Sequence, residues 1–263
     1  MILPYIFLIL LAAHPFCVSP AHTTNSNKNI FILAGQSNMS GRGGVVNNKW
    51  DEYIPPECQS NPRILRLTAE LLWEEAKEPM HQDIDYYAVC GIGLGMSFAN
   101  SVLKNEPKIG VIGLVPCAVG STNISQWSKG SSYYNQMLKR TQTALQGGGT
   151  VRALLWYQGE SDTLDLEDAK LYNSRLQKFF TDVRNDLYAP SLPIIQVALA
   201  TTLGHYKEII RQAQLGIHLK NVKTVDANGL KVGPDYVHLS TPAEVQLGQM
   251  LANAFLKFGS ENE

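Results

Sequence analysis

The sequence has few charged side chains and almost no net charge. Charged residues make up 17% of the 263 residues, and 22 basic against 23 acidic side chains leave a formal charge of −1. A nucleic-acid-binding protein normally carries a basic excess that displaces counterions from phosphates, and this chain has none. Disorder requires low hydrophobicity together with high net charge, whereas 44% of these residues are hydrophobic. The composition therefore excludes both classes and favours a neutral globular protein with a substantial core.

Cysteine is also scarce, and clustered metal ligands are missing from the sequence. Four cysteines are too few for a small disulfide-built scaffold. Because there is no Cys-x-x-Cys pair and no histidine-rich cluster, the sequence predicts neither a structural zinc site nor a cofactor. Of the three cysteines beyond the N-terminal segment, we expect Cys58 to pair with Cys90, because Cys117 falls in a buried apolar strand.

The longest apolar run lies at the N-terminus. Residues 2–18 include no charged side chain, and prolines interrupt the run before it reaches the roughly 20 apolar residues that a membrane-spanning helix needs. The pattern is typical of a secretory signal that is cleaved after Ala21. We therefore expect a signal peptide over 1–21, a single domain over 22–263, a secreted, extracellular protein and no stable membrane partner. An uncleaved anchor and an N-terminal core strand are the alternatives.

Short apolar runs then alternate with longer amphipathic ones. Near-continuous apolar strands indicate a parallel sheet that helices cover on both faces. Alternation through the whole chain predicts one doubly wound α/β domain. The exception is 45–87, where four prolines predict an irregular insertion. The predicted strands are 30–34, 109–115, 151–157, 193–200 and 222–226.

The predicted helices carry apolar residues at helical spacing, and glycine or proline ends several of them. The last one begins with Thr-Pro-Ala-Glu from Thr241, a capping box with proline at its first position. His205 and His218 fall on a predicted helix without other metal ligands nearby, so we assign them structural roles. The other predicted helices are 96–104, 133–145, 165–187 and 205–219.

Polar residues and glycines follow three predicted strands, at the edge where α/β sheets bind ligands. Ser37 comes directly after the first strand, between glycines. Gly120 follows the second, where the missing side chain lets a backbone N–H approach a ligand. Gln158 follows the third together with Glu160 and Asp162, and such polar groups need partners if they are buried. Taken alone, Ser37 is better explained as a helix cap in a glycine-rich turn, and Gly120 equally well as a plain turn glycine.

Asp235 and His238 stand just before the last predicted helix. At this spacing the carboxylate can accept the Nδ1–H of the imidazole and leave Nε2 to take a serine proton. A lone pair of this kind is more often a surface ion pair. Combined with Ser37, Gly120 and Gln158 at the same sheet edge, however, it supplies a nucleophile, a base, an orienting carboxylate and oxyanion donors.

Five stretches together resemble a known family: 31–43, 93–99, 116–120, 156–162 and 235–238. The chain resembles the SGNH hydrolases and, within them, the sialate O-acetylesterase-like branch, carbohydrate esterase family 6. It looks similar to plant probable carbohydrate esterases. The resemblance implies a three-layer α/β/α sandwich with a mainly parallel, five-stranded, flavodoxin-like sheet. It also implies a serine esterase that removes O-acetyl groups from an acetylated saccharide, such as xylan or another cell-wall polysaccharide, without a metal.

The family's roles carry over to single positions. The nucleophile falls on Ser37 and its catalytic partners on Asp235 and His238. The oxyanion donors fall on the backbone N–H groups of Ser37 and Gly120 and on the side chain of Gln158. The common family pattern has Gly-Asp-Ser and an asparagine donor, so Gly-Gln-Ser and Gln158 depart from it. The residues expected to support this site are Gln36, Asn38 and Glu160.

Other functions remain open at this point. Glu160 and Asp162 could serve as the acid and nucleophile of a glycoside hydrolase, and a non-catalytic carbohydrate-binding protein is a second alternative. Glycines at 91–95 after the strand-like segment 86–89 suggest a dinucleotide loop, although their spacing does not fit. Cys90 would be the nucleophile of a cysteine hydrolase.

Two glycosylation sequons begin at Asn38 and Asn123. Both lie in the loops assigned to the site, where a glycan would obstruct a ligand. We expect Asn38 to be unmodified and leave Asn123 open.

Overall fold

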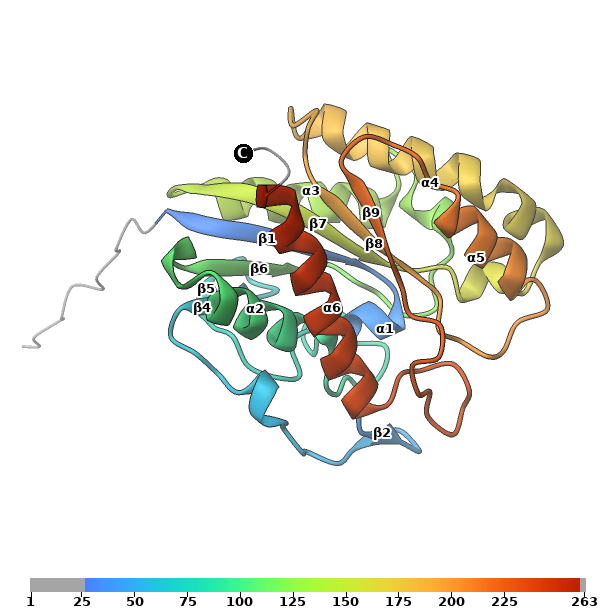
Figure 1. The fold of residues 1–263 in the computed structure, drawn as a ribbon, viewed down its shortest axis with the longest axis horizontal. Coiled ribbons are helices and arrows are strands. Elements are labelled where there is room, and N and C mark those ends of the chain that lie inside the picture. The colour runs from blue at the N-terminus through green and yellow to red at the C-terminus, as the bar shows by residue number, and fades with distance from the viewer. Residues whose placement is uncertain (1–26, 261–263) are drawn as a thin grey trace, which may run out of the picture.

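The computed structural model describes residues 27–260 (Figure 1). The predicted signal peptide over 1–21 lies outside this range. Within it, no helix has both the length and the apolar character needed to cross a membrane.

A seven-stranded sheet forms the centre of the fold, in the order β5-β4-β6-β1-β7-β8-β9. Neighbouring strands are parallel except for β4 and β5, which pair antiparallel. The mainly parallel sheet confirms the predicted fold class. Its strands are β1 (Lys28–Gly35), β4 (Ile64–Leu67), β5 (Trp73–Glu75), β6 (Ile112–Pro116), β7 (Gly149–Tyr157), β8 (Ile194–Ala198) and β9 (Val222–Asp226).

The predicted count of five strands is wrong, because β4 and β5 extend the sheet beyond β6. Both strands lie in 45–87, which was expected to be irregular, and they are only 4 and 3 residues long. The same segment contains the hairpin β2 (Val45–Val46) and β3 (Lys49–Trp50). Runs this short, interrupted by charged residues, leave no apolar pattern that a sequence reading can detect. The strand-like segment 86–89 forms no strand.

All five predicted long helices are present: α2 (Leu94–Asn105), α3 (Ser132–Leu145), α4 (Leu166–Asp186), α5 (Lys207–Leu215) and α6 (Thr241–Ser260). Asp165 begins α4 by accepting the N–H groups of Glu167 and Asp168, as expected of an N-cap. The helix predicted over 205–219 is shorter than expected, so His205 and His218 lie outside α5. A further short helix, α1 (Ser37–Ser40), follows β1 directly.

Aromatic contacts show that helices cover both faces of the sheet. On one face, the Phe31 ring of β1 meets Phe98 of α2 and Phe255 of α6, with ring centroids 5.0 and 4.9 Å apart. On the other, Trp156 of β7 packs against Phe179 of α4 at 4.4 Å. Figure 1 shows α2 and α6 crossing the same face of the sheet. The three-layer α/β/α sandwich is therefore confirmed.

The cysteines that the structure describes are free, and the predicted pair of Cys58 with Cys90 is wrong. All three described cysteines are buried. Cys58 ends a 3-10 turn that packs against α2, whereas Cys90 lies 3.4 Å from the guanidinium of Arg42. Cys117, directly after β6, is buried as expected. The thiols therefore behave as small core side chains.

Candidate active site

A continuous line of hydrogen bonds joins Ser37, His238 and Asp235. The Ser37 Oγ lies 2.8 Å from His238 Nε2, and His238 Nδ1 lies 2.6 Å from Asp235 Oδ2. Ser37 begins α1, directly beyond the carboxyl end of β1, and the other two residues precede α6. The structure therefore brings these three predicted residues together across 201 positions of sequence.

Gly35 determines how the chain leaves β1 and reaches Ser37. Its φ is +136°, and a Cβ at this position would lie 2.0 Å from the Tyr157 carbonyl oxygen. A side chain therefore cannot be placed there without moving β7. The following residue donates its backbone N–H to the same carbonyl at 2.9 Å, and the chain then turns into α1. This close approach explains why a glycine precedes the serine by two positions.

The loop of Asp235 orients its own carboxylate. Asp235 Oδ1 accepts the backbone N–H groups of Val237 and His238, each at 2.9 Å, which leaves Oδ2 for the imidazole. Burial raises the pKa of Asp235, but these two N–H groups and the His238 ring outweigh it and hold the pKa below its usual value. The carboxylate therefore stays ionised opposite the imidazole and favours the tautomer with a proton on Nδ1.

Asn38 connects three parts of the site. Its Nδ2 donates to Glu160 Oε1 at 2.6 Å and to the Val237 carbonyl at 3.2 Å, while its Oδ1 accepts the Leu239 N–H at 2.9 Å. Val237 and Leu239 flank His238 on either side, so one buried amide fixes the backbone on both sides of the imidazole. A nitrogen used in this way leaves no room for a glycan in the folded protein, in line with our expectation that Asn38 is unmodified.

Glu160 and Asp162 are buried and engaged with the loops around them. Burial raises the pKa of Glu160 to about 7 and that of Asp162 to about 6. Asp162 accepts the Ile124 N–H at 3.1 Å and the Gln158 side-chain N–H at 2.6 Å. Glu160 accepts from Asn38. Both carboxylates therefore hold neighbouring segments in place, as expected for buried charges.

Gln158 is fully buried, and its amide is used within the protein. Its Nε2 donates to the Thr122 carbonyl at 2.8 Å and to Asp162 at 2.6 Å, and its Oε1 accepts the Tyr172 hydroxyl at 3.0 Å. The side-chain amides of Gln36 and Gln158 lie 3.2 Å apart. The structure thus brings Gln36 and Gln158 together in the hydrogen-bond network next to Ser37. Both N–H groups of the Gln158 amide already donate to protein acceptors, Thr122 and Asp162.

Gly120 lies between Ser37 and a buried ion pair that the sequence did not indicate. A Cβ at Gly120 would lie 3.5 Å from the Ser37 Cβ, 2.9 Å from Arg42 Nη2 and 3.2 Å from Asp85 Oδ2. Arg42 pairs with Asp85 at 2.5 Å, and Ser40 also donates to Asp85. Asp85 lies in the proline-rich insertion, so no local pattern linked it to the site.

Two alternative readings lose their structural support. Burial raises the pKa of Cys90 to about 12, so this thiol is protonated at neutral pH and is a poor nucleophile. Gly91 lies against the loop after α1, because a Cβ there would be 2.2 Å from the Gly43 carbonyl oxygen. Glycine is therefore needed at 91 for packing, which removes the reason for a dinucleotide loop. Among the described residues, no group of three or more His, Cys, Asp or Glu side chains could hold a metal ion.

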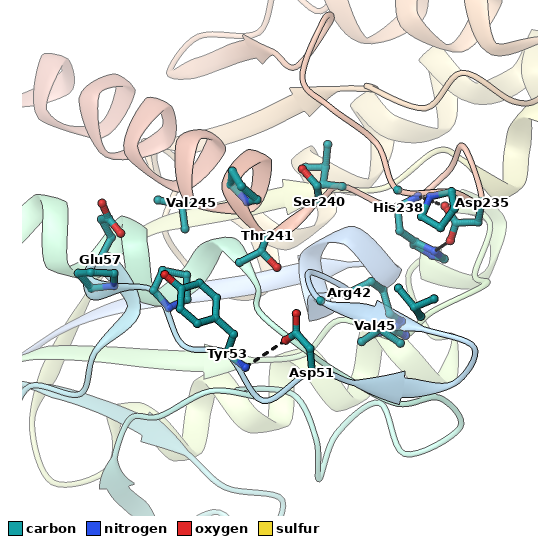
Figure 2. A pocket seen from close by; sticks show the side chains of 18 residues that line it. Arg42, Val45, Asp51, Tyr53, Glu57, Asp235, His238, Ser240, Thr241 and Val245 are labelled. Atoms are coloured by element: carbon teal, nitrogen blue, oxygen red, sulfur yellow. Dashed lines mark hydrogen bonds and ion pairs between the residues drawn. The ribbon is translucent and has the colours of Figure 1, made fainter.

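A pocket of about 690 Å³ adjoins the imidazole and carboxylate (Figure 2). Loop residues before α6, including Asp235 and His238, form one side. The hairpin β2–β3 and the residues after it, including Asp51 and Tyr53, form the other. The pocket therefore belongs to the same site as the hydrogen-bonded line, although the insertion that builds half of it was expected to be irregular.

Comparison with known proteins identifies the family. The sequence model described as carbohydrate esterase, sialic acid-specific acetylesterase matches residues 27–257. The chain belongs to this carbohydrate esterase family. It is accordingly a carboxylic ester hydrolase, in agreement with the resemblance drawn from the sequence.

Individual relatives agree with this assignment. A probable carbohydrate esterase of Arabidopsis thaliana is 54% identical over 234 residues, covering 86% of this chain and 90% of the relative. An X-ray structure of an Arabidopsis thaliana protein has 52% identity and a TM-score of 0.85, covering 88% of this chain and 98% of that one. The crystal structure of NanS shares the fold, with 18% identity, a TM-score of 0.72 and coverage of 89% and 98%.

Proposed function

We propose that this carbohydrate esterase removes O-acetyl groups from an acetylated saccharide through an acyl-enzyme on Ser37. The observation that carries the proposal is the line Ser37–His238–Asp235, with contacts of 2.8 and 2.6 Å. It places a hydroxyl, an imidazole and an ionised carboxylate in the order that general-base activation of a serine requires.

The chemistry begins with proton transfer from the Ser37 hydroxyl to His238 Nε2 as Oγ attacks the acetyl carbonyl carbon. Asp235 stabilises the imidazolium that forms. The tetrahedral intermediate then collapses: the bond to the sugar oxygen breaks, and His238 returns the proton to that oxygen. A water molecule, activated by the same imidazole, hydrolyses the acetyl-enzyme and releases acetate.

The oxyanion of each tetrahedral intermediate needs donors beside Ser37. The backbone N–H groups of Ser37 and Gly120 have no partner among the described residues, and each such donor is worth about 3 kcal/mol of transition-state stabilisation in acyl transfer. We propose Gln158 as a third donor. To serve this role its amide must release one of its bonds, to Thr122 or to Asp162.

The substrate class follows from the family and its relatives. The matching family is described by its action on sialic acid esters, and the Arabidopsis thaliana relative is named for carbohydrate esters. We propose xylan or another acetylated cell-wall polysaccharide as the substrate. The apolar N-terminal run supports a place of action outside the cell. Mass spectrometry of the exported protein would test this, with a mature chain that begins at His22 as the expected result.

Acetate release from a panel of acetylated xylan, pectin and sialic acid tests the function. The wild-type protein should release acetate and hydrolyse 4-nitrophenyl acetate, and a folded Ser37→Ala variant should do neither. Undiminished turnover by that variant would exclude the acyl-enzyme on Ser37. Sugar chains cleaved with their acetyl groups retained would instead point to a glycoside hydrolase that uses Glu160 and Asp162. The buried, hydrogen-bonded state of both carboxylates argues against that outcome.

A further inference from the structure

We infer that the pocket beside His238, here called the Tyr53 pocket, binds a neutral sugar of the leaving group. The inference rests on the proposed function, because a leaving group exists only if the ester is cleaved at Ser37. Its volume of about 690 Å³ falls within the range of roughly 300–1,000 Å³ that is usual for small-molecule sites.

The position of the pocket relative to the imidazole assigns it to the leaving group. Asp235 and His238 line it, but Ser37 and Gly120 do not. The acetyl group must contact the Ser37 Oγ and the oxyanion donors, so it lies on the side of His238 that faces Gly120. The sugar oxygen receives its proton from the same imidazole. A sugar attached to that oxygen can therefore extend from His238 into the Tyr53 pocket.

The lining of the pocket provides the contacts that a sugar ring uses. Tyr53 is 58% exposed, so its ring offers a flat apolar surface to the C–H face of a sugar. The Asp51 carboxylate accepts the Tyr53 backbone N–H at 3.0 Å through Oδ1, which fixes the two residues relative to each other. Figure 2 shows Asp51 directed across the pocket toward Thr241. A carboxylate and a hydroxyl facing each other supply an acceptor and a donor for sugar hydroxyls.

The charge of the lining selects against an anionic sugar. Carboxylates of Asp51, Glu57 and Asp235 line the pocket, and apart from the imidazole its only cationic side chain is Arg42. Arg42 is buried and neutralised by Asp85. A sugar carboxylate, as in sialic acid or galacturonic acid, would therefore meet like charge without an opposing cation, which costs binding energy. A neutral acetylated saccharide meets no such penalty.

Binding to a Ser37→Ala protein tests the pocket without turnover. Calorimetry would compare acetylated xylo-oligosaccharides, which are neutral, with acetylated oligogalacturonides, which are anionic. We expect the neutral ligand to bind at least about tenfold more tightly, because like charges across a site are strongly unfavourable. Adding Asp51→Asn removes one negative charge while leaving an oxygen to accept the Tyr53 N–H. This variant should bring the Kd values of the neutral and the anionic ligand closer together.

Removing the aromatic wall tests the role of Tyr53. In the same Ser37→Ala background, Tyr53→Ala should raise the Kd for the neutral ligand about tenfold, equivalent to about 1.4 kcal/mol. Tyr188→Ala is the matched control, because Tyr188 is 93% exposed, lies between α4 and β8 and does not line the pocket. It should leave the Kd unchanged. With Ser37 intact, Tyr188→Ala should also keep kcat/KM for 4-nitrophenyl acetate within about twofold of wild type, because Tyr188 does not line the pocket.

Failure of the inference can be told apart from failure of the proposed function. Three results would each overturn the pocket assignment: tighter binding of the anionic ligand, no binding of the neutral ligand, or an unchanged Kd after Tyr53→Ala. The proposed function would stand in each case, as long as hydrolysis of 4-nitrophenyl acetate still depended on Ser37. Hydrolysis that does not depend on Ser37 would overturn the proposed function itself.

Discussion

The side-chain amide of Asn38 donates a 2.6 Å hydrogen bond to the buried carboxylate of Glu160. This bond ties the segment after β1 to the segment after β7. The same amide holds Val237 and Leu239, the neighbours of His238. Asn38 and Glu160 thus act on the imidazole from a distance, as positioning residues that touch neither the acetyl group nor the sugar in the proposed reaction.

Replacing Asn38 by alanine should therefore slow the reaction more than it weakens binding. A displacement of His238 by 1 Å is expected to cost about 100-fold in kcat, whereas KM should change little because Asn38 does not line the Tyr53 pocket. Steady-state kinetics with 4-nitrophenyl acetate measure both constants. Asn105→Ala, which removes an exposed amide that bonds only within α2, is the control. Unchanged kcat in folded Asn38→Ala protein would refute the positioning role.

The two roles of Gln158 can be separated with a pair of variants. Gln158→Ala removes the proposed oxyanion donor together with the side-chain hydrogen bonds to Thr122, Asp162 and Tyr172, so both kcat and Tm should fall. Loss of one donor in acyl transfer costs about 100- to 1,000-fold in kcat. Tyr172→Phe removes only the hydroxyl that bonds Gln158, so Tm should fall with a much smaller change in kcat. Equal losses of kcat in both variants would show that Gln158 acts through the structure alone.

Gly120→Ala should impair the site by steric conflict. The added methyl group would lie 2.9 Å from Arg42 Nη2 and 3.2 Å from Asp85, and the ion pair behind it is buried and cannot move into solvent. We expect a loss of stability of about 1–3 kcal/mol, typical of overpacking, and a fall in kcat. Thermal unfolding and esterase assays measure the two effects. A variant with wild-type Tm and wild-type kcat would contradict the close packing of Gly120.

The sequence predicted those parts of the molecule that local patterns specify. The strand over 222–226 was predicted with its observed bounds, and three of its five residues (Val222, Thr224 and Val225) are β-branched and favour a strand. Asp235 and His238 are three residues apart, so a turn alone brings them together. The contact of Asn38 with Glu160 joins positions 122 residues apart, and such a contact depends on the register of the assembled sheet. The spacing of residues in the sequence therefore could not predict the hydrogen bond between Asn38 and Glu160, nor the three contacts that the Asn38 amide makes.

The insertion over 45–87 shows most clearly which structure could not be predicted from the sequence. Its four prolines predict irregular structure, yet it supplies β4, β5 and half of the Tyr53 pocket. Short edge strands need little apolar sequence of their own, because β6 supplies the hydrogen-bonding partner for β4. Tertiary context therefore determines structure here where propensity does not.

Glu78 provides a stability test based on pH. Burial raises the pKa of its carboxyl from 4.5 to about 8, although the N–H groups of Met80 and Gly93 oppose this rise. Below the unfolded pKa, both states hold the proton. Between that pKa and about 8, only the folded state holds the proton, so stability falls as pH rises, by at most about 1.4 kcal/mol per pH unit for one group.

The Tm of the wild type should therefore drop more between about pH 5 and about pH 8 than the Tm of Glu78→Gln, whose amide oxygen can still accept a backbone N–H. Burial and the charge of Glu78 both raise the pKa of nearby Glu244, so the difference between the two proteins reports Glu78 together with its effect on Glu244. Parallel Tm curves over this range would show that Glu78 does not hold its proton in the folded protein.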